Sequence, residues 1–216
     1  MSHVFLIGGG PGSGKSSIAK KLSKEYGIEY WKVDNFVGEH QQEAADRKFP
    51  INNYINNLSE DEQQLELLKL TSKQELARQE ELFFILIKEL RVRTFDYLVL
   101  EGNCLLPNLV AQRFEYPYTA VWLLPEPKFQ EKIYRKRDWA QELLAGSDDP
   151  GLLMKTWLKR DREYNEVVRN QAEIQKFPYL LVDGKKSIDD NYKWAKQKLK
   201  VTSILEHEHP SPQLTK

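Results

Sequence analysis

The sequence has little of what marks several large classes of protein. Cys104 is its single cysteine, which excludes a disulfide within the chain and is typical of a reducing cytoplasm. The 32 basic and 32 acidic residues cancel, so no charge excess indicates binding to nucleic acid or to a membrane surface. We see no basic leader and no long apolar run at the start of the chain, and no membrane span. We therefore expect a cytoplasmic protein with no nucleic-acid or membrane partner.

The composition suits a folded α/β domain. The chain has 216 residues, of which 40% are hydrophobic and 11% aromatic, enough for one sizeable core with a small inserted subdomain. Short apolar runs alternate with longer amphipathic stretches, which is the pattern of a parallel sheet covered by helices. We expect strands at about 3–8, 29–33, 96–101, 118–124 and 178–182.

The interval 36–95 is too long for a simple crossover and predicts a helical insertion between the second and third strands. Ser59 and Ser72 are each followed three residues later by glutamate, which indicates two helix starts. The dense charge of the interval 36–95 predicts that one face of its helices is solvated. A last helix is expected from a capping box at Ser187 to about Leu205, so the domain covers 1–205 and the polar tail 206–216 is expected to be disordered.

A glycine-rich segment, GGGPGSGKSS at 8–17, follows the first predicted strand. Gly9, Gly14, Lys15 and Ser16 have the spacing of a phosphate-binding loop. Glycines bring backbone N–H groups close to an anion, and the helix after the loop directs its positive end toward the same place. Lys15 would contact the β- and γ-phosphates, and the Ser16 hydroxyl would bind Mg²⁺. The predicted nucleotide-binding residues here are Gly9, Gly10, Gly12, Ser13, Gly14, Lys15, Ser16 and Ser17.

Two carboxylates follow the next predicted strands. Asp34 lies in VDNF after the second strand, and Glu101 ends the third in YLVLEGN. Ligands of open parallel sheets bind beyond the carboxyl ends of the strands, so both acids are expected beside the loop. There Asp34 can accept the proton of an attacking hydroxyl, and Glu101 can reach Mg²⁺. The alternative for Asp34 is a cap of the following turn.

With these motifs the chain resembles the P-loop small-molecule and nucleoside kinases of the adenylate-kinase-like fold. VDNF is similar to the strand-end segment of uridine kinases and chloramphenicol phosphotransferase, where the aspartate is the base. VLEGNCLLP is similar to segments of uridine and 2-phosphoglycerate kinases. The resemblance implies a three-layer P-loop NTPase fold, ATP, Mg²⁺ and transfer of the γ-phosphoryl group to a hydroxyl. Segment 36–95 matches none of these families clearly.

The same resemblance implies a lid at about 134–165 and an adenine site after the last strand. Arg135 and Arg137 are candidate lid arginines; they point to different sides of a helix, so we expect one on phosphate and the other on a carboxylate. Arg160, Arg162 and Arg169 are further candidates. Gly184 would line the adenine, or serve only as a tight turn.

The chain lacks the Asn-Lys-x-Asp segment of GTPases and the Ser-Gly-Gly signature of transporter ATPases. The leading hypothesis is therefore a kinase for a small metabolite, nucleoside or antibiotic, acting as a monomer or homodimer. A nucleoside-monophosphate kinase would need arginines in the insertion to hold the acceptor phosphate; Arg47, Arg78, Arg91 and Arg93 are available. A third reading is a nucleotide-gated module whose insertion binds a protein partner.

Overall fold

The sheet organises the molecule. The computed structural model describes residues 2–208. Its five strands lie in the order β2-β3-β1-β4-β5, and every neighbouring pair is parallel. The predicted α/β class and five-stranded parallel sheet are confirmed, with bounds close to those expected: β1 His3–Gly9, β2 Glu29–Lys32, β3 Tyr97–Glu101, β4 Tyr118–Pro125 and β5 Tyr179–Val182.

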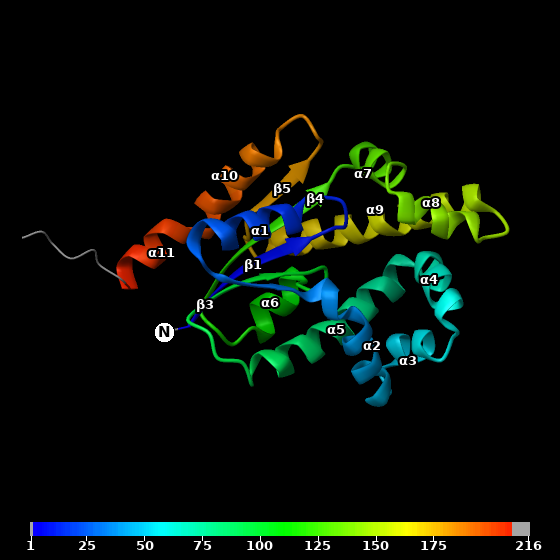
Figure 1. Ribbon diagram of the computed structural model, residues 1–216, viewed down its shortest axis with the longest axis horizontal. Helices are drawn as coiled ribbons and strands as arrows, with labels where there is room; N and C mark the ends of the chain where they lie inside the picture. The colour runs from blue at the N-terminus through cyan, green and yellow to red at the C-terminus, as the bar shows by residue number, and fades with distance from the viewer. Residues whose placement is uncertain (1, 209–216) are drawn as a thin grey trace, which may run out of the picture.

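Helices cover both faces of this sheet, which gives three layers (Figure 1). Alternate residues of a strand point to opposite faces, so Phe5 and Ile7 pack under α1 (Lys15–Tyr26) and α10 (Ile188–Leu199). Val4 and Leu6 face the other layer. That layer contains α5 (Ser72–Leu90), α6 (Pro107–Arg113) and α9 (Pro150–Ile174).

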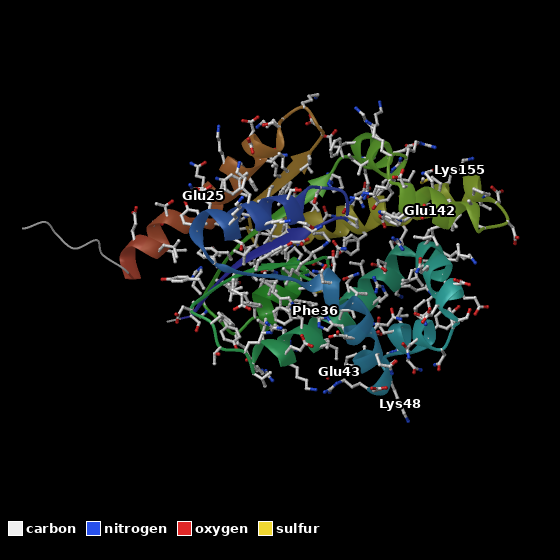
Figure 2. All side chains as sticks on the ribbon, viewed as in Figure 1. Glu25, Phe36, Glu43, Lys48, Glu142 and Lys155 are labelled. Carbon is white, nitrogen blue, oxygen red and sulfur yellow. The ribbon has the colours of Figure 1, made fainter. Side chains whose placement is uncertain are left out.

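The predicted insertion is present between β2 and β3, and it is more elaborate than two helices. The chain passes from β2 into a short 3₁₀ helix, η1 (Val33–Phe36), and then into α2 (Val37–Asp46), α3 (Pro50–Asn56), α4 (Glu60–Lys69) and α5. Phe36, labelled in Figure 2, is the last residue of η1, where the chain passes into α2. Ser59 caps α4 in a capping box with Glu62, as predicted. The second start is one residue earlier than predicted, because Thr71 and Gln74 form the box of α5.

The charge of the insertion is not all solvated, so that prediction is wrong for α5. Glu75, Arg78 and Glu81 are buried. Glu81 accepts hydrogen bonds from the backbone N–H groups of Ile51 and Asn52, both at 2.9 Å, and so caps the start of α3. Glu81 therefore joins α5 to α3, whereas Glu75 and Arg78 pair with each other on α5.

The segment 134–165 contains the end of α7 (Pro127–Tyr134), then α8 (Asp138–Ala145) and the first part of α9. We use the name lid for α7, α8 and this part of α9, which extends the predicted lid of 134–165 to the start of α7; its closing over phosphate stays a prediction. Leu68 of α4 packs with Leu144, Leu153 and Leu158 in a small core of its own. The insertion and the lid therefore share side-chain packing at one end of the molecule (Figure 1).

The last helices extend further than predicted. The Ser187 capping box opens α10, which ends at Leu199, and α11 (Val201–Glu208) follows. Residues 206–208 are thus helical rather than part of a disordered tail, and 209–216 lie outside the described residues. Among residues 2–208, no helix combines the length and apolar character that crossing a membrane requires.

Candidate active site

The predicted phosphate-binding loop connects β1 to α1 at the carboxyl edge of the sheet. Gly9, Gly12 and Gly14 have φ values of 121°, 83° and 87°, which side chains rarely adopt. Gly14 is the N-cap of α1. Gly9 is also held against β4, since a Cβ there would lie 2.0 Å from the carbonyl oxygen of Leu123. The loop therefore has a backbone conformation that suits close approach to an anion.

The loop is also enclosed by the lid layer. A Cβ on Gly10 would lie 1.9 Å from Oδ1 of Asn165 on α9. The Nε2 of Gln130 on α7 donates a hydrogen bond to the carbonyl oxygen of Pro11 at 3.1 Å. Side chains of α7 and α9 thus set the outer limits of the loop.

Lys15 is buried rather than free in solvent. Its Nζ donates to the carbonyl oxygen of Gly10 at 2.9 Å and to Oδ1 of Asn103 at 3.0 Å, and lies 4.0 Å from Oε1 of Glu101. Burial lowers the pKa of Lys15, while the charges of Glu101 and Asp34 raise it. The ammonium is therefore held inside the site by groups that a phosphate can replace.

Glu101 is fully buried at the end of β3. Its Oε2 accepts a hydrogen bond from Tyr30 at 3.1 Å, whereas Oε1 has no hydrogen-bond partner among residues 2–208. Burial raises the pKa of Glu101, and Lys15 and the Ser16 hydroxyl lower it. An unsatisfied carboxylate oxygen beside a serine hydroxyl fits a hard cation such as Mg²⁺, which prefers oxygen ligands.

Asp34 lies in η1, two residues beyond Lys32, the last residue of β2, which pairs with Glu101 of β3. Its side chain is half-buried. Asp34 raises the pKa of both Lys15 and Glu101, in each case after the larger effects of burial and of the Lys15–Glu101 pair. The carboxylate is therefore close to the two charged residues of the loop site.

Three other predicted nucleotide-site residues, Ser13, Ser17 and Gly184, differ in burial and in their contacts. Ser13 is buried, and its Oγ has no hydrogen-bond partner in the described part of the chain. Ser17 is exposed in the first turn of α1. Gly184 has a φ of 79° in the turn between β5 and α10, and a Cβ there would lie 2.5 Å from the ring of Phe129 on α7. The turn after β5 is thereby fitted against α7.

The two predicted lid arginines face different ways. Arg135 is exposed, and its Nη2 donates to Oε1 of Glu131 at 2.9 Å. It lines a cavity of about 650 Å³ between α7, α8 and α9. Arg137 instead acts electrostatically on Lys15, whose pKa its charge lowers, and it lies 5.8 Å from the ring centres of Tyr134 and Trp139. Of the two, Arg137 is the one whose charge affects the pKa of Lys15 in the loop.

The remaining arginines of α9 are also engaged. Arg160 is buried and binds Asp161 at 2.8 Å and the carbonyl oxygen of Leu67. Arg162 donates to Glu131 at 3.3 Å. Arg169 lies 3.9 Å from Glu173.

A buried polar chain connects the loop to the insertion. Gln130, which contacts Pro11, also contacts the hydroxyl of Tyr134 at 3.1 Å. Tyr134 donates to Asp161, which accepts from Arg160, and Arg160 reaches the α4 carbonyl of Leu67. These four side chains belong to α7 and α9, so the polar chain runs through the lid and links the loop to the segment 36–95.

Sequence reasoning missed Asn103, Tyr30, Gln130 and Asn165. Asn103 directly follows the Glu-Gly pair of the segment EGN, so the sequence held a weak signal for it. Tyr30 lies two residues before Lys32 and thus on the same face of β2, which is a weak signal for Tyr30. Gln130 and Asn165 have no local signal. They reach the loop only because α7 and α9 pack against it.

Comparisons with solved structures identify the fold. A deoxyadenosine kinase from M. mycoides matches with a TM-score of 0.53 and 18% identity, over 93% of this chain and 99% of that chain. A gluconokinase from Sinorhizobium meliloti 1021 matches with a TM-score of 0.54 and 15% identity, over 97% and 98%. A shikimate kinase from Bacteroides thetaiotaomicron matches with a TM-score of 0.52 and 14% identity, over 92% and 98%.

The protein has the fold of P-loop small-molecule kinases. This bears out the fold expected from the loop, the strand-end acids and the parallel sheet. No family model and no curated protein matches the chain. At these identities the similarity establishes the architecture, and the chemistry has to be argued from the site.

Proposed function

We propose that the protein is an ATP-dependent kinase that transfers the γ-phosphoryl group to a hydroxyl of a small metabolite, nucleoside or antibiotic. The observation that carries this proposal is the position of Asp34. A carboxylate beside Lys15 and Glu101, just beyond the sheet edge, can accept the proton of a hydroxyl aligned with the γ-phosphate. The fold shared with small-molecule kinases supports the same reaction class.

The residues of the loop have separate tasks in this proposal. Backbone N–H groups of the loop and the start of α1 bind the phosphates. Lys15 exchanges its contacts with Gly10 and Asn103 for the β- and γ-phosphates. Ser16 and Glu101 would hold Mg²⁺, which supplies neutralisation of phosphate charge when bound. Arg137 adds a guanidinium as charge moves to the equatorial oxygens, and Gly184 lines the adenine.

The environment of the insertion arginines argues against a nucleoside-monophosphate kinase. An acceptor phosphate would need guanidinium groups available to bind it. Each arginine of segment 36–95 instead pairs with a carboxylate: Arg47 with Glu43 at 3.1 Å, Arg78 with Glu75 at 3.0 Å, Arg91 with Glu115 at 2.5 Å and Arg93 with Glu29 at 3.4 Å. Figure 2 shows Glu43 at the outer edge of the insertion, far from Glu142 and Lys155 of the lid.

Asp34→Asn tests the proposed function. The substitution keeps size and hydrogen bonding and removes basicity, so we expect ATP affinity within a few-fold of the parent. Phosphoryl transfer should fall by about 10²–10⁴-fold, the usual effect of a positioned general base. A panel of nucleosides and metabolites, screened for acceptor-stimulated ADP release, supplies the assay.

Asp46→Asn is the matched control, because Asp46 is an exposed acid of α2. It should leave turnover unchanged. If an acceptor is found and Asp34→Asn transfers phosphate at the parent rate, Asp34 only caps the following turn. That result would contradict its role as the base of a hydroxyl kinase. Slow ATP hydrolysis that no acceptor of the panel stimulates, together with tight binding of a protein partner, would favour the nucleotide-gated module.

A further inference from the structure

Arg78 differs from the other arginines of the insertion. Arg47, Arg91 and Arg93 are exposed, whereas Arg78 is only 8% exposed. Its Nε and Nη2 donate to the two carboxylate oxygens of Glu75 at 3.0 and 3.2 Å. Glu75 is held in turn by Nε2 of Gln79 at 2.7 Å. The guanidinium is therefore fixed in one orientation on α5.

One edge of this guanidinium is unsatisfied. Arg78 Nη1 is buried and has no hydrogen-bond partner within residues 2–208. A buried donor without a partner costs free energy, more so on a charged group. In native structures such a group is completed by a water molecule, an ion or a ligand.

Arg78 and Asp34 lie near the same buried thiol, that of Cys104. Burial raises the pKa of Cys104, Asp34 raises it further and Arg78 lowers it, so both charges act on this one thiol. Leu82, one helical turn after Arg78, packs in the same core as Val33 and Cys104. Val33 is the residue before Asp34. The buried guanidinium of Arg78 and the candidate base Asp34 thus both lie near Cys104.

The charges of this region are balanced without an acceptor. Burial raises the pKa of Glu75, but Arg78 and Arg160 lower it more, so the net shift is downward and the carboxylate is ionised. Arg160 pairs with Asp161 at 2.6 Å. The formal charges of Glu75, Arg78, Arg160 and Asp161 cancel, and Asp34 adds a negative one. Burial raises the pKa of Asp161, while Arg160 and the Tyr134 hydroxyl oppose that shift. A phosphate or carboxylate brought here would meet no surplus positive charge.

We propose that Arg78 is a specificity residue whose Nη1 donates a hydrogen bond to an uncharged oxygen or nitrogen of the acceptor. The site then selects neutral polar hydroxyl compounds, such as nucleosides, sugars and polyols, over hydroxy acids and phosphorylated compounds. This inference rests on the proposed kinase function and names the substrate class of the same site. Glu75 and Gln79 are then positioning residues, because Glu75 binds the Arg78 guanidinium and Gln79 holds Glu75.

A stability measurement tests the inference without any acceptor. The double variant Glu75→Gln/Arg78→Met removes both charges and the unsatisfied donor while keeping volume. We expect its thermal midpoint to equal or exceed that of the parent, because a neutral replacement of a buried ion pair restores what its desolvation costs. A fall of more than about 5 °C would show that the pair is needed for folding stability and would overturn the specificity role.

Matched compounds test the substrate class. Deoxyadenosine is compared with its 5′-monophosphate, and glucitol with gluconate, by stimulated ADP release with Mg-ATP. We expect the neutral member of a pair to be the better acceptor. Arg78→Lys, which keeps a cation for Glu75 but loses the planar fork, should raise the KM for that acceptor about tenfold or more, with kcat and the KM for ATP within about threefold.

Arg91→Lys is the control, since Arg91 also pairs with a carboxylate but is exposed. It should change none of these constants. Preference for the charged member of a pair, or an unchanged acceptor KM in Arg78→Lys, would overturn the inference and leave the kinase proposal standing. If none of the four compounds stimulates ADP release although Mg-ATP binds, the proposed function fails for these acceptors, and the specificity role of Arg78, which rests on it, is overturned with it.

Discussion

At the scale of single residues, the ionisation of Glu101 should contribute a stability that falls as pH rises. Burial raises the folded-state pKa of Glu101 above 4.5, although Lys15 opposes the shift. The folded protein then binds more protons than the unfolded chain above pH 4.5, so this stability is present below that pH and is lost as pH rises through the folded-state pKa.

Glu101→Gln cannot ionise, so its free energy of unfolding should decline less with pH above 4.5 than that of the parent. Urea unfolding at a series of pH values, without nucleotide or Mg²⁺, measures the difference. Glu80→Gln, at an exposed position of α5, is the control and should follow the parent curve. Parallel curves for Glu101→Gln and the parent would contradict the assignment of a raised pKa to Glu101.

Arg135 and Arg137 offer a matched pair for the lid. Arg137→Ala should lower kcat by about 10²-fold with a smaller change in ATP affinity, because its charge matters most in the transition state. Arg135→Ala should leave kcat within about threefold, since that guanidinium binds Glu131 at the surface. Steady-state kinetics with the identified acceptor measures both. A larger loss in Arg135→Ala would place the other face of α7 over the phosphates.

At the scale of elements, α3 depends on a carboxylate from another helix. Glu81 of α5 accepts two backbone N–H bonds at the start of α3 and a side-chain bond from Asn52 at 2.6 Å. Glu81→Gln places an amide donor among donors, so we expect a loss of about 2 kcal/mol in the free energy of unfolding. Chemical denaturation measures it. The exposed neighbour Glu80→Gln should lose little, and equal losses would rule out the cap.

The elements also show where sequence reasoning succeeds. Glycine spacing, apolar runs and the Ser59 box are local signals, and the loop, the five strands and the α4 start follow from them. The start of α5 was misjudged because Thr71 and Ser72 each fit the same pattern. The structure uses Thr71, which leaves Glu75 free to bind Arg78 inside the protein.

The rest of the site could not be predicted because it depends on contacts between distant segments. Asn165 meets the loop only once α9 packs on the sheet, and Lys15 finds Asn103 across 88 positions of sequence. The burial of Glu75 and Glu81 is of the same kind. Their charge predicts a solvated helix face, and the partners that pay for their burial lie on other turns and helices.

At the scale of the whole molecule, Leu68 joins the insertion to the lid. It is buried against Leu144, Leu153 and Leu158. Leu68→Ala should destabilise the protein by about 2–5 kcal/mol and lower kcat, because the cavity loosens the contact between two segments that enclose the site. Thermal unfolding and steady-state kinetics measure the two effects.

Leu152→Ala is the control, since Leu152 lies on the same helix, α9, but is 60% exposed. It should change neither quantity much. If Leu68→Ala lowers stability while kcat stays at the parent value, the packing between insertion and lid serves folding alone.

On the proposed kinase function, this shared packing limits how the protein can diverge. A substitution that adapts the insertion to a different acceptor also alters the surface on which α8 and α9 rest, through Leu68 and through the Arg160 contact with Leu67. Selection for a different acceptor would then also change the catalytic rate, because the same residues affect both. A lineage that acquires a new acceptor must also accumulate compensating changes in the lid, so we expect the two segments to change together among descendants of this chain.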